Sequence, residues 1–435
     1  MNRFFFLSVF VATLPCAVWL AACGSGSGND AEQRSSADSG KAAVPYPPKP
    51  DPDPFYAQPS PMPDVAPGTI LNSRKVTFAP ALSAPMPNAA WQLQFMSRDV
   101  NDQPIAAVAT VVMPLVPALV GAAPLVSYQF AEDSLGMQCA PSHTLTGGTA
   151  NNNSQAETLE YLPGLTAQGW TMVFPDHEGP NSSYAVGKLA AQISLDAIRA
   201  AESFAPLGLA GKQTPVGLWG YSGGALATAW AAALQATYAP ELSIVGVASG
   251  GTPADLISVA RAFDSGLGNA AFFSLGFSGV IGATRSYPEL LPESILNDKG
   301  KAAVAALANG CVGGTGDGSP QPRGHFADYT NTNAFETPGV KATAPKIALP
   351  QAGHLPIARM YLYHSQIDEL IPIAGTDALV KSWCDSGVHI SYYRAVTGEH
   401  VALAATGAPD AILYLASTFA GATAPVVPLL ATTCN

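Results

Sequence analysis

Residues Val216 to Leu234 read Val-Gly-Leu-Trp-Gly-Tyr-Ser-Gly-Gly-Ala-Leu-Ala-Thr-Ala-Trp-Ala-Ala-Ala-Leu. The apolar residues before Ser222 predict a buried strand, and the alanine-rich segment after it predicts a helix. Gly220 and Gly224 stand two residues to either side of Ser222, where missing side chains let the strand and the helix approach closely. The five-residue pattern alone also fits a loop of small residues. The flanking strand and helix favour a strained turn that presents Ser222 as a nucleophile.

The first turn of the helix after Ser222 has backbone N–H groups without intrahelical acceptors, and these favour negative charge. An oxyanion formed at Ser222 would be stabilised there, and the N–H of Gly223 is one expected donor. A nucleophilic serine also needs a base and an orienting acid elsewhere in the chain.

Composition excludes several classes of protein. The chain has 435 residues, of which 48% are hydrophobic and 12% charged, enough for one large domain with an insertion and a sizeable core. The formal net charge is −11, whereas nucleic-acid binders carry an excess of Lys and Arg, so no nucleic-acid partner is expected.

The N-terminus predicts export. Residues 1–22 combine Arg3 with an apolar run and then small residues, the pattern of a signal peptide that is removed. The ending Leu20-Ala21-Ala22-Cys23 resembles a bacterial lipobox, so Cys23 is expected to carry acyl chains and anchor the protein to a membrane. An ordinary signal peptide followed by a chance cysteine is the alternative. No other apolar run looks long and uninterrupted enough to span a bilayer.

Residues 23–67 are rich in Gly, Ser and Asp and then in Pro, which predicts a flexible tether carrying the anchor cysteine. The folded domain is expected over residues 68–435. It opens with a hairpin: Trp91 to Phe95 alternates apolar and polar residues, Asn101-Asp102 marks a turn, and Ile105 to Met113 forms the second strand.

Strands and helices then alternate. Residues 124–130 and 169–176 predict buried strands, and residues 185–204 predict a helix. Repeated βα units imply a doubly wound, mostly parallel sheet. Asp133 follows the first of these strands, where an α/β hydrolase supplies its second oxyanion N–H, although an Asp that caps the next turn is the alternative. His177 and Glu178 are interpreted as loop structure.

The regular pattern breaks over about residues 253–350, which predicts an inserted helical cap. Residues 270–277 are unusually apolar, and residues 310–318 are glycine-rich. The phenylalanines in the first of these segments either fill the core of the cap or line an apolar acyl pocket.

The regular α/β pattern resumes with a strand expected over residues 359–364, and Asp368 lies in the loop that follows it. Another strand, over residues 388–393, leads to a loop that holds His400. Ser222, Asp368 and His400 thus follow the chain order of nucleophile, acid and base at one edge of the sheet. Glu369 is the alternative acid and Glu399 a neighbour of the base. His364 and His389 lie inside the expected strands, where packing rather than catalysis explains them.

Several ordered motifs together resemble the secretory lipase family, which is typified by Candida antarctica lipase A. They are Gly220-Tyr221-Ser222-Gly223-Gly224-Ala225, Tyr128-Gln129-Phe130-Ala131-Glu132-Asp133 with Cys139-Ala140-Pro141-Ser142, Asp176-His177-Glu178-Gly179-Pro180, and the late Asp368 and His400. The resemblance runs from about Pro67 to the C-terminus. It implies an α/β-hydrolase core with a helical cap, esterase or triacylglycerol lipase activity, and an oxyanion role for Asp133.

The resemblance also implies two disulfides. Four cysteines remain after removal of the signal and acylation of Cys23, and three pairings are open to them. The family pattern of one bridge near the oxyanion loop and cap and one near the C-terminus selects Cys139–Cys311 and Cys384–Cys434. The lipobox, the tether and His177, which replaces an aromatic residue, depart from the family pattern.

Ester or lipid hydrolysis through an acyl-enzyme on Ser222 is the leading hypothesis. A serine acyltransferase or peptidase on the same fold, and a non-catalytic lipid-binding lipoprotein, are the alternatives. No cofactor is expected. No metal is expected either, because the sequence lacks a Cys/His cluster with ligand spacing.

Overall fold

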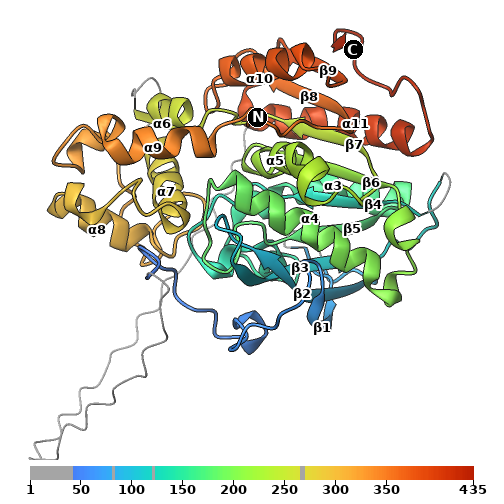
Figure 1. Cartoon of the computed structure of the whole chain (residues 1–435), viewed down its shortest axis with the longest axis horizontal. Coiled ribbons are helices and arrows are strands. Elements are labelled where there is room, and N and C mark those ends of the chain that lie inside the picture. Colours follow the sequence, from blue (N-terminus) through green and yellow to red (C-terminus); the bar gives the residue numbers. More distant parts are fainter. Residues whose placement is uncertain (1–42, 81–83, 120–122, 265–269) are drawn as a thin grey trace, which may run out of the picture. The chain divides into compact units, whose positions relative to one another are not determined.

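A ten-stranded sheet organises the described part of the chain, in the order β1-β2-β3-β5-β4-β6-β7-β8-β9-β10 (Figure 1). Its strands are β1 (Ile70–Thr77), β2 (Ala89–Arg98), β3 (Pro104–Val112), β4 (Leu125–Gln129), β5 (Thr171–Pro175), β6 (Val216–Tyr221), β7 (Ile244–Gly250), β8 (Arg359–Ser365), β9 (Ile390–Ala395) and β10 (Thr432–Cys434). The six strands from β5 to β9 in this order are parallel, and antiparallel strands complete both edges. The predicted mostly parallel α/β-hydrolase sheet is therefore confirmed.

The computed structural model describes residues 43–80, 84–119, 123–264 and 270–435. The expected signal peptide, Cys23 and residues 24–42 of the expected tether lie outside the described residues. Residues 44–435 form one unit, and the description below concerns that unit.

Helices cover both faces of the sheet. They are α1 (Pro141–Thr144), α2 (Asn152–Ala156), α3 (Thr158–Pro163), α4 (Gly187–Ser203), α5 (Gly223–Tyr238), α6 (Leu256–Asp264), α7 (Ala270–Ser286), α8 (Asp298–Leu307), α9 (Pro338–Ile347), α10 (Ile373–Asp385) and α11 (His400–Phe419). Successive strand residues point to opposite faces, so Leu218 packs with α4, α5 and α10 while Trp219 packs with α3 and α11. Both side chains are fully buried, as expected for a sheet covered on two sides.

Helices α6 to α9 follow β7 and precede β8, and they gather at one end of the sheet (Figure 1). Helices α7 and α8 share a small core, in which Phe273 and Phe277 of α7 pack against Phe326 and Tyr329. The group α6 to α9, called the cap below, lies at the edge of the sheet where β6, β7 and β8 end.

Residues 44–58 differ from the expected tether, because they pack on the domain. Phe55 and Tyr56 are buried beside Val108, and Asp53 forms an ion pair of 2.6 Å with Arg74. Composition favoured an extended, solvated segment, but two aromatic rings among the prolines find an apolar surface to cover. We call residues 44–58 the N-terminal strap.

The strap also contacts the cap. The Tyr46 hydroxyl donates to the carbonyl oxygen of Leu291 (2.8 Å), and the guanidinium of Arg285 donates to the carbonyl oxygen of Tyr46 (2.9 Å). The backbone N–H of Lys49 donates to Oδ1 of Asn309 (2.6 Å). The strap therefore bridges the cap and the antiparallel edge of the sheet.

Helix α11 is long and apolar enough to cross a membrane, with a mean hydropathy of 1.2. No such run was expected beyond the N-terminal apolar segment. In the fold α11 packs along the sheet, and Leu403, Ala411 and Leu415 are buried there. Those contacts account for the apolar inner face of α11, whereas 39% of its apolar window is buried and Val401 and Leu413 are exposed.

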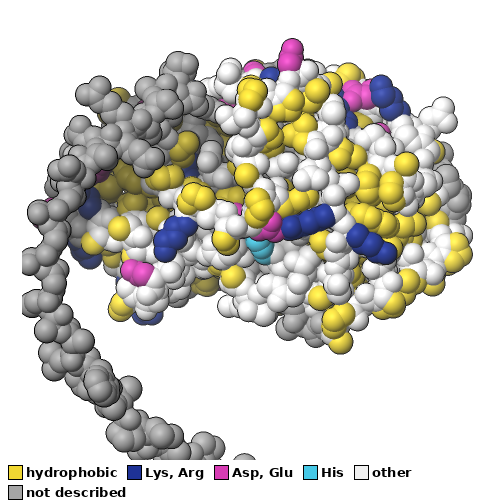
Figure 2. Space-filling model, turned by 90° about the horizontal axis from the view of Figure 1, so that it is seen from below, with side chains coloured by type: hydrophobic (Ala, Val, Ile, Leu, Met, Phe, Trp, Pro, Cys, Tyr) yellow, Lys and Arg dark blue, Asp and Glu magenta, His cyan; other side chains and the backbone are white. Residues whose placement is uncertain are grey.

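Charged side chains are sparse on the surface as well as in the sequence. On the face seen in Figure 2, the Lys and Arg side chains are scattered among hydrophobic and uncharged ones and do not gather into a basic patch. This distribution agrees with a chain in which only 12% of residues are charged.

Candidate active site

Ser222 occupies the sharp turn between β6 and α5, with φ of 52° and ψ of −121°. Positive φ is strained for a residue with a side chain, and the hydrogen bond from the Ser222 N–H to the Gly250 carbonyl oxygen (2.8 Å) helps to hold it. Both flanking glycines are needed for space. A Cβ on Gly220 would lie 2.5 Å from the Gly224 carbonyl oxygen, and one on Gly224 would lie 2.0 Å from that of Gln129.

Ser222, His400 and Asp368 form one continuous chain of hydrogen bonds. Oγ of Ser222 lies 2.8 Å from Nε2 of His400, and Nδ1 of His400 lies 2.6 Å from Oδ2 of Asp368. Asp368 follows β8, and Ser222 follows β6. The carboxyl ends of parallel strands meet at one edge of the sheet, which explains why residues so distant in sequence come together.

His400 is the first residue of α11, whereas the sequence analysis placed it in a loop. The helix begins there because Glu399 caps it: its carboxylate accepts the N–H groups of Val401 (2.7 Å) and Ala402 (3.1 Å). Glu369, the alternative acid, accepts the backbone N–H of His400 at 3.0 Å. Both glutamates therefore hold the backbone around the ring, and Asp368 contacts the ring itself.

The carboxylate of Asp368 is stabilised in its charged form. Burial alone would raise the pKa of Asp368, but hydrogen bonds from His364 and His400 outweigh burial and hold that pKa well below its usual value. His364 is buried in β8, as expected, but its contact with Asp368 was missed. His389 lies just before β9 and is exposed, so the expectation that packing fixes it is wrong.

Asp133 adjoins the turn that holds Ser222. Its backbone has a φ of 47°, and a Cβ on Gly223 would lie 1.9 Å from Oδ1 of Asp133. Burial raises the pKa of Asp133 to about 6, against the opposing effects of the charge on His400 and a hydrogen bond from Tyr184. The Asp133 side chain thus lies beside the N-terminus of α5.

Buried acidic residues hold the loop that carries Asp133. Glu157 accepts the backbone N–H of Ala131 (2.9 Å), and Glu178 accepts that of Ser134 (3.2 Å). The Tyr128 hydroxyl lies 3.0 Å from Glu157 and 3.1 Å from Glu160. The Tyr128 hydroxyl has one hydrogen, which can be donated to only one of the two carboxyl groups. The Glu157–Glu160 pair is therefore expected to carry one further proton.

His177 belongs to the same buried layer. Its Nε2 lies 2.8 Å from the Phe130 carbonyl oxygen, and burial lowers the pKa of His177 to about 4. The ring is therefore neutral and structural, in line with the interpretation of His177 and Glu178 as loop structure. Glu157, Glu160 and Tyr184 could not be identified from the sequence, because nothing in their local sequence shows whether a polar side chain is buried or exposed.

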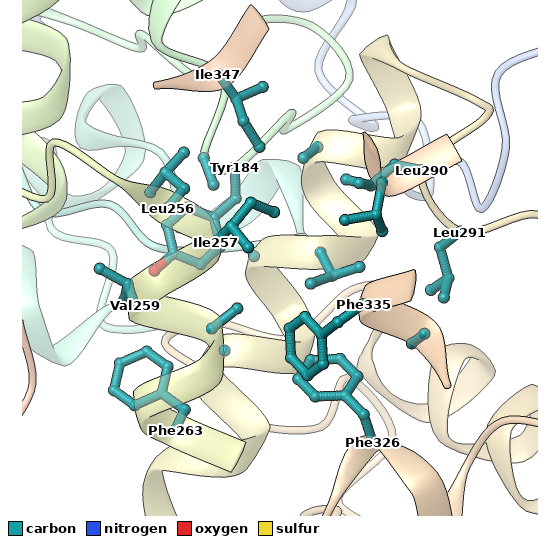
Figure 3. Close-up of a pocket in the computed structure, with 18 of the residues that line it drawn as sticks. Tyr184, Leu256, Ile257, Val259, Phe263, Leu290, Leu291, Phe326, Phe335 and Ile347 are labelled. Carbon is teal, nitrogen blue, oxygen red and sulfur yellow. The ribbon is translucent and has the colours of Figure 1, made fainter. Parts of the chain in front are cut away.

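An apolar cavity opens between the cap helices α6, α7 and α9 (Figure 3). The ring of Tyr184 lies on one side of it, next to Leu256 and Ile257, and Phe326 and Phe335 lie across from it. Tyr184 also bonds to Asp133, so one residue of the cavity wall contacts the loop beside Ser222. Its free volume is about 70 Å³, roughly half of the 150 Å³ that an apolar cavity needs to hold benzene.

Of the two roles that the sequence left open for the phenylalanines of α7, packing is the one observed, and none of them lines the cavity. Phe273 and Phe277 are fully buried in the core of the cap and do not line the cavity. Phe272 packs against Phe263 and Leu370 in a separate small cluster. Smaller residues of α7, among them Gly276 and Gly279, face the cavity instead.

Two disulfides brace the domain. Cys139 is bonded to Cys311, which ties the segment after Asp133 to the cap, and Cys384 is bonded to Cys434, which ties α10 to β10. These are the pairs named from the family resemblance. Stable disulfides are typical of exported proteins. Among the described residues, no group of three His, Cys, Asp or Glu side chains could hold a metal ion.

Known proteins share this architecture. Residues 148–426 match the family model described as secretory lipase. Lipase A of Arthroderma benhamiae is 34% identical over 85% of this chain and 79% of its own length. A probable inactive lipase of Mycobacterium tuberculosis is 33% identical over 84% of this chain and 82% of its own length.

Among solved structures, Candida antarctica lipase A superposes with a TM-score of 0.76 and 28% identity, covering 86% of this chain and 87% of its own. The match of fold and sequence extends over the strands that carry Ser222, Asp368 and His400. The chain therefore belongs to the secretory lipase family of carboxylic ester hydrolases.

Proposed function

We propose that Ser222 is the nucleophile of an ester hydrolase, with His400 as its general base and Asp368 as the residue that orients the imidazole. The observation that carries the proposal is the hydrogen-bonded chain from Oγ of Ser222 through both ring nitrogens of His400 to Oδ2 of Asp368. Each residue has the partner that its role needs.

The reaction proceeds in two halves. Oγ of Ser222 attacks the ester carbonyl carbon while its proton passes to Nε2 of His400, and the resulting oxyanion accepts hydrogen bonds from the N–H groups of Gly223 and Asp133. The tetrahedral intermediate then expels the alcohol, which takes the proton from His400. Water attacks the acyl-enzyme with the same base, which releases the carboxylic acid and restores Ser222.

The cap cavity is proposed to receive the acyl chain of the substrate. It is apolar, and Tyr184 connects it to Asp133. A volume of about 70 Å³ accommodates only a short part of a fatty acyl chain, so longer chains require the cap helices to separate. Each methylene group buried there contributes about 0.8 kcal/mol, which favours medium and long acyl esters over acetate.

A fluorophosphonate probe tests the nucleophile directly. The folded protein is expected to be labelled at Ser222, with loss of ester hydrolysis in proportion to labelling. Labelling that fails in folded protein would favour a non-catalytic lipid-binding lipoprotein. Product analysis with added alcohols or amines separates hydrolysis from acyl transfer.

We further propose that the exported protein is anchored through Cys23. The proposal rests on the sequence Leu20-Ala21-Ala22-Cys23 at the end of an apolar leader, which matches a lipobox. Acylation there would hold the enzyme at the cell envelope.

A further inference from the structure

Two histidines contact the carboxylate of Asp368. Nδ1 of His400 lies 2.6 Å from Oδ2, and Nε2 of His364 lies 3.2 Å from the same oxygen. The other oxygen, Oδ1, accepts the backbone N–H groups of Leu370 (2.9 Å) and Ile371 (2.7 Å). His364 is fully buried in β8, and no step of the proposed reaction uses it.

The contacts of His364 require a hydrogen on both of its ring nitrogens. Nε2 faces two acceptors, Oδ2 of Asp368 and the carbonyl oxygen of Ile371 at 3.0 Å, so it donates. Nδ1 lies 2.9 Å from Oγ1 of Thr376. The only hydrogen of that hydroxyl is used in its 2.7 Å bond to the carbonyl oxygen of Thr252, so Nδ1 donates as well. A histidine ring with two N–H donors carries a positive charge.

The surroundings supply one counterion for that charge. Within the described residues, Asp368 is the carboxylate that lies within 4.0 Å of the His364 ring. The other charged groups on the neighbouring elements have their own partners: Arg394 with Asp377, Asp255 with the backbone of Ile257 and Ser258, and Glu369 with the backbone of His400.

We propose that His364 is a buried imidazolium that shares Asp368 with His400 and acts as a positioning residue of the catalytic triad. The inference rests on the catalytic roles proposed above. The cation fixes the orientation of the carboxylate, and its positive charge opposes protonation of His400.

The charge of His364 can be measured without catalysis. Mature Ser222→Ala protein labelled with 15N-histidine is expected to show two N–H signals for His364 from pH 5 to pH 8, assigned by their absence in Ser222→Ala/His364→Gln. Ring nitrogens of His364 that show a single N–H at pH 7 would overturn the proposal. Because this protein has no nucleophile, the result stands or falls independently of the proposed reaction.

The kinetic consequence is tested with His364→Gln, which keeps a polar side chain and removes the charge. The acidic limb of its kcat/KM profile is expected to move to higher pH by about one unit, because a neighbouring cation has been lost. His389→Gln, which changes an exposed histidine outside the site, is the matched control and should reproduce the wild-type profile. An unshifted limb in His364→Gln, with activity lowered equally at every pH, would reduce His364 to a packing residue.

Discussion

A Cβ on Gly223 would lie 1.9 Å from Oδ1 of Asp133, so these two residues meet without room for a single added carbon. The contact joins the turn at Ser222 to the loop after β4. It also brings together the two residues whose N–H groups are proposed to bind the oxyanion, Gly223 and Asp133.

Replacing Gly223 by Ala should therefore disable the oxyanion site. The added methyl group pushes the Asp133 loop away, and loss of one oxyanion donor lowers kcat about 100- to 1,000-fold. Steady-state kinetics on a chromogenic ester measure the loss. Gly375→Ala in α10, where the nearest atom to a Cβ is 3.6 Å away, is the control and should retain wild-type rates. Equal rates in both variants would remove Gly223 and Asp133 from the oxyanion site.

Ser222→Ala and His400→Ala should each lower turnover by at least about a thousand-fold, because triad members act as a unit. For the same reason the double variant should be hardly slower than either single one. Rates are compared on a single ester with active-site titration of the wild type. Retention of more than about a tenth of the activity in either single variant would contradict the assignment.

Filling the cap cavity should change chain-length preference. Gly279→Leu places a side chain beside the Tyr184 ring, which lies 3.4 Å from a Cβ at this position. We expect kcat/KM for decanoyl esters to fall about ten-fold relative to acetyl esters, the equivalent of roughly two buried methylene groups. Ala378→Leu on the exposed side of α10 is the control. A uniform loss on all esters would show that the cavity only holds the cap together.

Stability should fall as the pH rises through neutrality. Burial raises the pKa of Glu160 to about 8 from the usual 4.5, so between these values the folded protein binds more protons than the unfolded chain. Under that condition the free energy of unfolding decreases with increasing pH.

Thermal denaturation from pH 5 to pH 8 measures this slope. Glu160→Gln should flatten it, whereas Asp385→Asn, at an exposed ion pair with Lys381, should leave it unchanged. An identical slope in Glu160→Gln would mean that Glu160 does not hold its proton in the folded state.

Cys23→Ser should move the protein from the membrane fraction to a soluble or uncleaved form. Cell fractionation and the mass of the mature N-terminus report the change. Unaltered fractionation, with no acyl mass on the wild-type protein, would favour an ordinary signal peptide.

The sequence predicted the parallel sheet well, because buried strands such as residues 216–221 are apolar runs bounded by turns. It also predicted that Ser222, Asp368 and His400 would meet, since each follows a strand that ends at the same edge. Strand β1 was missed, as its run of four consecutive polar residues, 72–75, resembles a linker. The cap phenylalanines could not be assigned, because helical periodicity does not say which neighbour a face will meet.

The contacts of His364 lay beyond sequence reasoning for a different reason. A histidine inside an apolar strand gives no sign of its partners, and here they come from residues 252, 368, 371 and 376. The same holds for Glu157 and Glu160, which become a proton-sharing pair only when Tyr128 is brought between them.

The N-terminal strap has a practical consequence for anyone who trims this protein for expression. The change in composition near Pro67 suggests a cut there, but such a cut would remove Phe55, Tyr56 and the brace that Tyr46 provides to the cap. Val108 would be left facing water, and Arg285 would lose one of its carbonyl partners. A shortened gene that begins at Val44 keeps the whole brace and discards only the expected leader, Cys23 and the residues that follow it.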